Sequence, residues 1–483
     1  MLTMSLVFLA YLVVLFGLAL WTRGETHSLS GYFLANKKLP PWVVAFSTNA
    51  TGESGWLLLG LTGMAYSVGV QAFWVIAGEV LGIAVTWIFL ARRIKHLGDV
   101  SGSITVPDLI SAPFEDPTHL LRKISVAIIL LMVGAYVSAQ MVATGKAFNT
   151  FTGMDYNLAV VFGAGIIITY TLIGGYKAVA YTDLVQGILM LLGLILVPVV
   201  AIIALGGWQS LIDGLQQADA ELLNLRGNGG SGGSEGSGVK GWVILVSFLA
   251  IGLPYMGMPQ LVVRFMSAES EASIPTAAII SVCVTLAYGC GAVLTGLAGR
   301  VLMPGLEDAE TIFPRLASDL FHPALTGLLM VVVLAAIMST VDSLLLLASS
   351  AVVRDTLQQI RGAVHSESEF AVYGKIVTLI IGVLAIWFAL SQSPLIFWFV
   401  LFAWSGLGAA FAPLILCIFF YRGLTLAGAV AGMLGGFLTS MVWVVSPLKS
   451  LTYDMYEMIP GFIVGLVLIV VVSKATISVQ SDG

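Results

Sequence analysis

Charged residues are scarce in this chain of 483 residues: Asp, Glu, Lys and Arg make up 10% of it, whereas a soluble domain carries about 25%. The exterior of a soluble globule of this length has to face water, and so few charges cannot cover it. The scarcity excludes a soluble enzyme and a disordered chain. A net charge of −5 without any basic block also argues against a nucleic-acid-binding protein.

Cysteine and histidine are also rare. The three cysteines, Cys283, Cys290 and Cys417, lie inside apolar runs and form neither a disulfide framework nor a zinc-binding pattern. The five histidines lie outside or at the ends of apolar segments and form no ligand cluster. Because no span carries paired histidines or a nucleophile with its base, we expect no enzyme active site and no resident metal cofactor.

Long apolar segments dominate instead, since 58% of the residues are hydrophobic. A helix crosses the hydrocarbon core of a bilayer with about 20 residues, and these segments are too long and unbroken for barrel strands. The sequence therefore predicts an all-α polytopic membrane protein. We predict thirteen spans, at residues 4–22, 41–68, 70–91, 124–149, 157–175, 178–206, 240–263, 273–303, 323–352, 370–392, 394–420, 424–446 and 458–473.

Lysine and arginine predict the orientation, because cytoplasmic loops carry an excess of them. With the N-terminus outside, 15 of the 21 basic residues fall on the cytoplasmic side. The other six are Lys146, Arg226, Lys240, Arg300, Arg315 and Lys449. We predict an outer N-terminus and a cytoplasmic C-terminus. The glycine-rich run at 227–238 is expected to be a flexible outer loop, because it lacks the closing residues of a phosphate-binding loop.

Two spans contain breaks. The second span is polar over 47–54. Its residues 49–55, which include Asn, Thr, Gly, Glu and Ser, favour an unwound stretch. The seventh span carries Gly252, Pro254, Gly257 and Pro259 within eight residues, so helical hydrogen bonds must be missing there. Interrupted helices at matching places in two halves are typical of inverted-repeat transporters with their site at the breaks. A pair of proline kinks in a packed bundle is the alternative.

The matching breaks also divide the chain. Each broken span begins a set of five helices, which gives repeats at 41–206 and 240–420 within a single membrane domain. An extra helix at 4–22 precedes the two repeats, and two further helices at 424–473 follow them. We therefore expect one transport domain over the whole chain, and no separate soluble domain.

The ninth span brings polar side chains into the membrane. Ser339, Thr340, Asp342 and Ser343 lie within one and a half helical turns, and four oxygen side chains so close together are typical of a site for a hard cation. Back-bonding of the hydroxyls to the preceding turn is the alternative. Asp183, at the start of the sixth span, is a second carboxylate, either part of that site or an interfacial residue.

Seven motifs in register resemble one family. At these segments the chain resembles the sodium/solute symporter family, and above all its proline-transporting members. The resemblance implies a LeuT-like core of spans 2–11, cation-driven uptake and alternating access. The motifs lie at 32–39, 54–63, 135–148, 173–187, 252–264, 334–343 and 458–465.

The resemblance also implies site residues. It places a sodium ion between the carbonyls of Ala50, Glu53 and Ala336 and the hydroxyls of Ser339 and Thr340. A second sodium site, present in some members, would use Asp183, Asp342 and Ser343 together with Ser339. The implied substrate site consists of Ser54, Gly55, Trp56, Tyr136, Tyr255 and Pro259.

The chain departs from the proline transporters in two places. Their tryptophan one turn before the tyrosine is Ile251 here, and their intramembrane aspartate is Gly52, followed by Glu53 where they carry an apolar residue. We expect Glu53 to give an oxygen to sodium or to carry a proton. Alternatively, it caps the amides that the break frees. Glu79 in the third span is a candidate partner for Glu53 through a shared proton or ion.

These observations predict sodium-coupled secondary active uptake of a small organic solute, most closely proline or a related amino acid, by a monomer in the bacterial inner membrane. The partners are the solute and the lipid bilayer, with no nucleic acid. The alternatives are coupling to H+, another small carboxylate or sugar-type solute, and a transporter-like solute sensor. Uptake under imposed gradients separates these functions.

Overall fold

The chain is helical throughout the residues that the computed structural model describes, which are 2–25, 28–226, 237–391 and 396–481. The predicted loop at 227–238 lies outside them, except for its last two residues. The α-helices are α1 (Leu2–Thr22), α2 (Leu29–Leu34), α3 (Pro41–Gly55), α4 (Thr62–Val68), α5 (Phe73–Val85), α6 (Arg92–Val100), α7 (Val106–Ser111), α8 (Leu120–Thr152), α9 (Tyr156–Ala204), α10 (Trp208–Ala218), α11 (Ser237–Leu249), α12 (Pro259–Ser267), α13 (Ile274–Leu302), α14 (Ile312–Leu320), α15 (Pro323–Ser350), α16 (Glu367–Ser391), α17 (Ile396–Phe420), α18 (Leu426–Val445), α19 (Leu448–Leu451) and α20 (Met458–Ser481).

Within the described residues, eleven helical stretches are long and apolar enough to cross a membrane, which confirms the predicted class of fold. The two longest are Pro41–Val100 and Tyr156–Ala204, and each covers two of the predicted spans. The first turns at Gly69 (φ 71°) and the second breaks at Gly175 (φ 60°), where the left-handed backbone favours glycine. The count of thirteen crossings stays a prediction.

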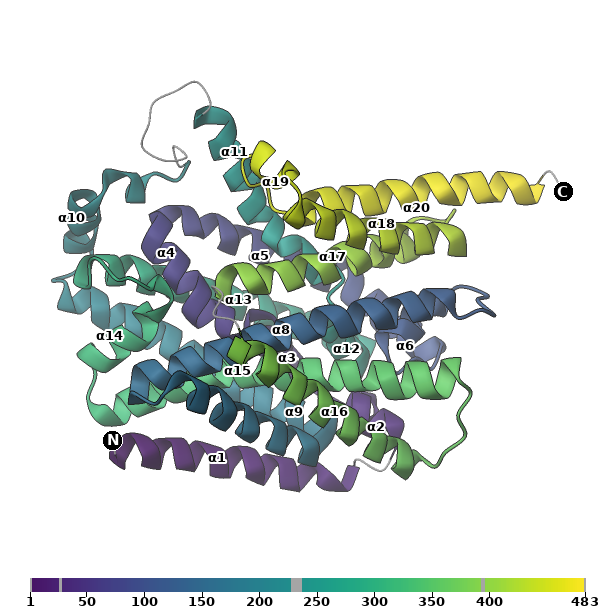
Figure 1. Ribbon diagram of the computed structural model, residues 1–483, viewed down its shortest axis with the longest axis horizontal. Coiled ribbons are helices and arrows are strands. Elements are labelled where there is room, and N and C mark those ends of the chain that lie inside the picture. Colours follow the sequence, from purple (N-terminus) through teal and green to yellow (C-terminus); the bar gives the residue numbers. More distant parts are fainter. Residues whose placement is uncertain (1, 26–27, 227–236, 392–395, 482–483) are drawn as a thin grey trace.

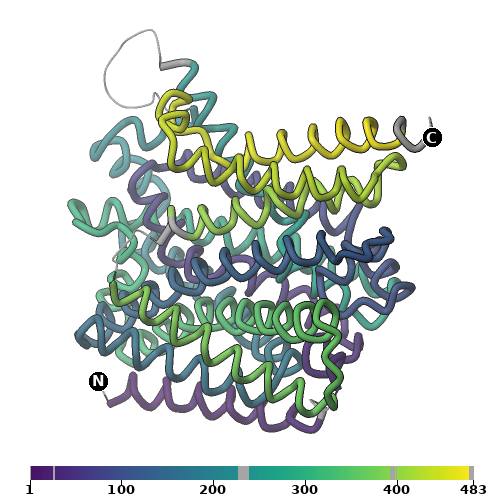
Figure 2. Tube along the Cα trace, turned by 45° about the vertical axis from the view of Figure 1, so that its right-hand side comes forward, coloured from purple at the N-terminus to yellow at the C-terminus, as the bar shows by residue number. Residues whose placement is uncertain are grey.

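The helices form a bundle whose outer surface is apolar. Large hydrophobic side chains on the outside, such as Leu2, Trp387 and Val445, are more than half exposed, as expected where lipid covers the protein. The two termini lie at opposite ends of the bundle (Figures 1 and 2). This placement agrees with the predicted odd number of crossings, and the sidedness itself stays a prediction.

The centre of the bundle is α15. Every residue from Leu329 to Ser350 is buried, although four of the residues between 339 and 343 are polar. This helix packs against α1, α3, α8 and α9, so it has protein on all sides (Figure 1). A helix buried all round has no lipid-facing side, and its polar groups must therefore find partners inside the protein.

The predicted break in the seventh span is confirmed. Helix α11 ends at Leu249, a 3-10 helix follows over Ala250–Met256, and α12 begins at Pro259. The N–H groups of Gly257 and Met258 both donate to the carbonyl of Pro254, at 2.8 and 2.9 Å. The two prolines and the glycine thus produce the interruption that their chemistry requires.

Glycines hold this broken segment against α5. A Cβ built on Gly252 would lie 1.8 Å from the Gly78 carbonyl oxygen, and one built on Gly82 would lie 2.0 Å from the Gly252 carbonyl oxygen. The two backbones approach so closely that no side chain fits between them. The contact fixes Glu79, which follows Gly78, beside the broken segment.

We expect the substitution Gly252→Ala to disrupt this contact. Adding a methyl group to a well-packed interior costs about 1–3 kcal/mol, and more where backbone has to move. The midpoint of thermal unfolding of the purified protein in detergent should fall. The matched control is Gly165→Ala in α9, where a Cβ meets nothing within 4 Å. An equal effect of both variants would contradict the packing argument.

Buried ion pairs lie near both ends of α8. Near its start, the Arg122 guanidinium contacts Asp108 of α7 at 2.5 Å and also pairs with Asp355, which follows α15. Near its other end, Lys146 Nζ lies 2.6 Å from Glu310 Oε2. The two clusters join segments that are far apart in the sequence, at the two ends of a helix that crosses the whole bundle.

Candidate ion and substrate site

Helix α3 breaks at Ser54, whose backbone has φ 55° and ψ −173°. A non-glycine residue in this conformation is strained, and such residues cluster at functional sites. The amides at the break are satisfied by side chains. The Gly55 N–H donates to Gln140 Oε1 (3.1 Å) and the Trp56 N–H donates to Ser54 Oγ (3.1 Å).

The break is narrower than the predicted unwound stretch over 49–55, since only Ser54 is non-helical inside α3. The helix persists there because its polar side chains find partners. Thr48 Oγ1 donates to the Val44 carbonyl one turn earlier (2.6 Å), and Asn49 Nδ2 donates to the Ser281 carbonyl of α13 (2.8 Å). The prediction of an extended unwound segment was therefore wrong in its length, and right about where the helix fails.

Glu53 does not cap the amides at the break. Gln140 and Ser54 already occupy those of Gly55 and Trp56, and Glu53 Oε1 instead accepts a hydrogen bond from the Tyr255 hydroxyl at 3.3 Å. The capping interpretation was therefore wrong at these two amides. The sequence analysis also missed Gln140, although a glutamine in the middle of an apolar span is itself a signal.

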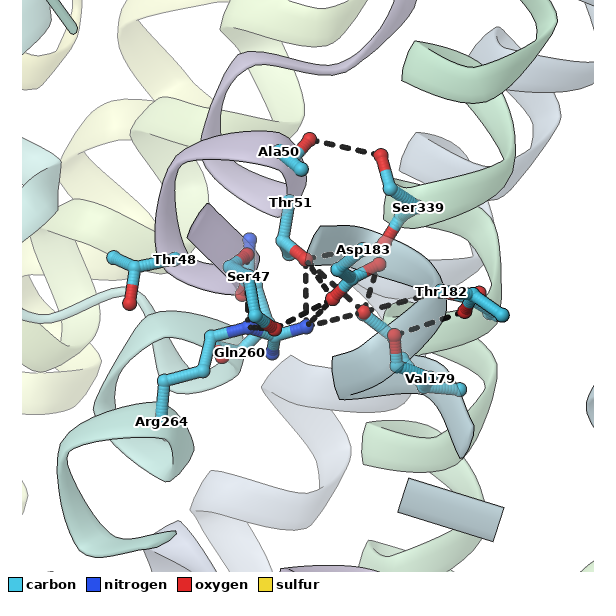
Figure 3. Close-up of polar contacts among 12 residues, drawn as sticks. Ser47, Thr48, Ala50, Thr51, Val179, Thr182, Asp183, Gln260, Arg264 and Ser339 are labelled. Atoms are coloured by element: carbon cyan, nitrogen blue, oxygen red, sulfur yellow. Dashed lines mark hydrogen bonds and ion pairs between the residues drawn. The ribbon is translucent and has the colours of Figure 1, made fainter. Parts of the chain in front are cut away.

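The break in α3 lies against the polar part of α15. Ser339 Oγ donates to the carbonyls of Ala50 (2.9 Å) and Ala336 (3.0 Å), and Thr340 Oγ1 donates to the carbonyls of Thr51 (3.1 Å) and Ala336 (3.4 Å). Figure 3 shows Ser339 and the Ala50 carbonyl turned toward each other. Four of the five predicted sodium ligands thus meet at one place.

The fifth predicted ligand is the Glu53 carbonyl, which accepts the Trp56 N–H in this structure. The donor set is nevertheless what Na+ requires: neutral carbonyl and hydroxyl oxygens, all from buried residues, converging from two helices. Residues of this kind fit a sodium ion. The described residues contain no group of three or more His, Cys, Asp or Glu side chains that could hold a transition metal.

The predicted second sodium site holds the guanidinium of Arg264. Arg264 Nη2 donates to Asp183 Oδ2 (3.0 Å), to Thr51 Oγ1 (2.6 Å) and to Ser343 Oγ (2.5 Å), while its Nε donates to Ser47 Oγ (3.0 Å). Figure 3 shows the guanidinium of α12 reaching between α3 and α9 to these oxygens. A second sodium at this place stays a prediction that requires Arg264 to move.

The sequence analysis missed Arg264 because its position resembles a span end. It follows the break by five residues and was therefore assigned to a cytoplasmic loop. In the structure it is 1% exposed, and its Nη1 also donates to the Gln260 carbonyl (2.6 Å). The only sequence signal was the need of the buried carboxylate Asp183 for a cation.

Asp342 lies beside this cluster and has its own partners. Its carboxylate accepts hydrogen bonds from the Tyr170 hydroxyl of α9 and from Ser343 Oγ, the latter at 3.1 Å. The predicted trio is connected through Arg264, because the Ser343 hydroxyl donates to Asp342 and accepts from Arg264, which in turn pairs with Asp183. One carboxylate is paired with Arg264, and the other is held by hydroxyl groups.

A small pocket of about 10 Å³ lies beside the two breaks, with room for about one water molecule. Of the predicted substrate residues, Trp56 and Tyr136 line it. Trp404 also lines the pocket and was not predicted from the sequence. The centre of its ring lies 5.1 Å from that of Tyr255 and 6.5 Å from that of Tyr136. The full lining is Gly52, Trp56, Glu79, Tyr136, Ile251, Val400, Leu401 and Trp404.

The other predicted substrate residues lie around this pocket without lining it. Tyr255 stands behind Gly52, and a Cβ on that glycine would lie 3.4 Å from its ring. Ser54 and Gly55 form the break in α3. Pro259 begins α12, where a proline belongs because the first helical amide needs no partner. The position of Pro259 is therefore explained by the break in the seventh span, at the start of α12.

Gln140 is expected to hold the break open. In the variant Gln140→Ala, the buried Gly55 amide loses its acceptor, and an unpaired buried donor costs about 1–3 kcal/mol. Thermal unfolding should begin at a lower temperature. The matched control is Gln186→Ala, another buried glutamine, which bonds only to the Tyr11 hydroxyl among the described residues. If Gln140→Ala were the milder of the two, the role given to Gln140 would be wrong.

Comparison with known proteins identifies the family. The model of the sodium:solute symporter family matches residues 32–436, which is most of the chain and includes both breaks, α15 and Arg264. The chain belongs to this family. It is therefore a membrane transporter of the class that couples the movement of a solute to sodium.

Individual relatives cover nearly the whole symporter. The sodium/proline symporter of Staphylococcus aureus is 36% identical over 478 residues, which is 96% of this chain and 91% of the relative. That of Staphylococcus aureus strain JH9 is 36% identical over 466 residues, 94% of this chain and 89% of the relative. The likeness to these relatives thus covers nearly the whole chain.

Solved structures share the fold of the symporter. A sodium-coupled sialic acid symporter in a substrate-bound outward-open state superposes with a TM-score of 0.79 at 17% identity, covering 98% of both chains. MhsT in complex with L-phenylalanine superposes with a TM-score of 0.53 at 15% identity, covering 89% of this chain and 97% of MhsT. These identities are low, and the likeness is one of fold.

Proposed function

We propose that this symporter takes up proline or a related small amino acid, driven by the sodium gradient across the cytoplasmic membrane. The observation that carries the proposal is the meeting of α3 and α15, where two hydroxyls and two carbonyls of the predicted sodium set converge beside a broken helix and an aromatic pocket. The name of the Staphylococcus aureus relatives supports proline as the solute.

In this proposal, sodium binds between Ala50, Glu53, Ala336, Ser339 and Thr340. The ion would replace the hydroxyl protons that now point at the carbonyls, so that all five oxygens face it. Because these oxygens come from α3 and α15, the ion would tie the two helices together. It would thereby shape the pocket next to α3 before the solute arrives.

Alternating access would use the two five-helix repeats, 41–206 and 240–420. The small volume of the pocket supports a closed state, since it admits about one water molecule and no amino acid. The ion pairs of Arg122 and Lys146 lie 24 residues apart on α8, about 36 Å along the helix, and would lock the two ends alternately.

Sodium supplies enough free energy for accumulation. One charge crossing a potential of about 100 mV is worth about 2.3 kcal/mol, and a tenfold sodium gradient adds about 1.4 kcal/mol. Together they support a solute gradient of several hundred-fold for one sodium per solute. A monomer with an outer N-terminus and a cytoplasmic C-terminus completes the proposal.

The test is uptake of labelled proline into proteoliposomes that contain the purified symporter and potassium. With external sodium, proline should accumulate above its external concentration, and an inside-negative potential should increase the accumulation because net positive charge enters. With potassium on both sides, proline should only equilibrate. Equal uptake in sodium and potassium would refute sodium coupling, and sodium-driven uptake of other solutes with none of proline would refute the substrate.

A further inference from the structure

Two buried glutamates lie in or next to the wall of this pocket. Glu53 of α3 is 1% exposed and Glu79 of α5 is 2% exposed. Glu79 lines the pocket, and Glu53 directly follows Gly52, which also lines it.

Neither carboxylate is satisfied by the protein. Glu53 Oε1 accepts one hydrogen bond from Tyr255, while Oε2 of Glu53 and Oε2 of Glu79 are buried without a hydrogen-bond partner among the described residues. A buried carboxylate that lacks partners is strongly disfavoured. The amides at the α3 break are bonded to Gln140 and Ser54, so neither glutamate is needed to cap them.

Neither glutamate forms an ion pair with a basic side chain among the residues that the structure describes. None of the residues that line the pocket is Lys, Arg or His. The buried Arg264 of α12 donates its hydrogen bonds elsewhere, to Ser47, Thr51, Asp183, Gln260 and Ser343. The positive charge that balances the two carboxyl groups therefore has to be a bound proton or a cation that the pocket binds.

The rest of the pocket wall is apolar, and three of its residues are aromatic. Trp56, Tyr136 and Trp404 line it, and Tyr255 packs edge-on against Trp404 while its hydroxyl reaches Glu53. Carboxylates combined with the faces of tryptophan and tyrosine rings are the usual receptor for an ammonium or quaternary nitrogen. The two carboxylates would repel an anionic solute, and a neutral solute could donate hydrogen bonds to them without balancing their charge.

We propose that Glu53 and Glu79 bind the positively charged nitrogen of the transported solute, and that this pair makes the symporter select organic cations and amino acids over acids of the same shape. The inference rests on the proposed function, because it describes the solute of that same pocket. Two carboxylates also favour a solute with a net positive charge over the zwitterion, since the second negative charge is otherwise unbalanced.

The test compares solutes of one shape and different charge on the purified wild-type protein in sodium, by thermal stabilisation. Proline is the zwitterion, prolinamide keeps only the cation, and tetrahydrofuroate keeps only the carboxylate. Prolinamide should bind at least as tightly as proline, and tetrahydrofuroate at least tenfold more weakly. Binding of tetrahydrofuroate equal to that of proline would overturn the inference.

A second pair of solutes tests the cation site independently of the proposal that proline is the substrate. Choline carries a quaternary nitrogen, and its tert-butyl analogue has the same shape without the charge. If the proline series fails to bind and choline binds more tightly than its analogue, the proposed substrate is wrong and the cation site stands. If no cation in either series stabilises the protein, the cation site is wrong.

Variants assign the effect to the two side chains. Glu53→Gln and Glu79→Gln should each weaken binding of prolinamide at least tenfold and reduce its advantage over tetrahydrofuroate. The matched control is Glu457→Gln, a buried glutamate bonded to Lys449 (3.1 Å) and Ser405 (3.2 Å), which should leave that advantage unchanged. If a variant fails to fold, the wild-type solute series still decides. An unchanged advantage in a folded Glu79→Gln would contradict the inference.

Discussion

Replacing Arg264 by methionine is expected to destabilise the symporter by about 3–5 kcal/mol, because the change leaves the Asp183 carboxylate buried without its cation. Both partners are at most 1% exposed, and the guanidinium also holds Ser47, Thr51 and Ser343. The Asp183 carboxylate is fully buried, so bulk water does not compensate for the lost cation. The midpoint of thermal unfolding of the purified protein in detergent should therefore fall steeply.

A double-variant cycle makes this prediction specific. Asp183→Asn alone should also destabilise, since it leaves the guanidinium unpaired. The double variant Asp183→Asn with Arg264→Met removes both charges. It should be more stable than either single variant, because burying a neutral group costs less desolvation free energy than burying an unpaired charge. Purely additive losses would show that the pair contributes nothing beyond the packing of each side chain.

The second large effect is expected at Thr340. Thr340→Ala removes one of the two hydroxyls that α15 presents to the α3 carbonyls, and we expect the sodium concentration for half-maximal proline uptake to rise at least tenfold. The maximal rate at saturating sodium should change less. Uptake in proteoliposomes over a series of external sodium concentrations measures both quantities.

Two controls accompany this variant. Thr340→Ser keeps the oxygen. Its sodium concentration for half-maximal uptake should stay within about threefold of the wild-type value, which corresponds to about 0.7 kcal/mol. Ser349→Ala removes a buried hydroxyl from the same helix, one that donates to the Gly374 carbonyl of α16 (2.9 Å) far from α3. If Ser349→Ala changed the sodium dependence as much as Thr340→Ala, the effect would not come from an ion site.

Much of the fold could be predicted from the sequence because its causes are local. Proline and glycine at 252–259 fix the break in the seventh span, and long apolar runs fix the helices. The break in α3 is less local. Thr48 and Asn49 keep the helix intact over residues that look unwound, and they do so through partners that the sequence does not reveal, such as Ser281 of α13.

The site shows the same division. Ser339 and Thr340 could be found because four polar residues in an apolar helix are conspicuous, and the resemblance gave them a role. Arg264 and Trp404 were missed, since an arginine after a break looks like a loop residue and a tryptophan in an apolar span looks like packing. Only the three-dimensional contacts with Asp183 and Tyr255 distinguish them.

Binding of radiolabelled sodium to the purified protein tests most directly the claim that the coupling ion lies between α3 and α15. Wild type and Thr340→Ala are measured side by side, with circular dichroism to show that both are folded. The wild type should bind sodium saturably in the presence of excess potassium, and the variant should lose most of this binding. A folded Thr340→Ala protein that binds sodium as tightly as the wild type would contradict the account.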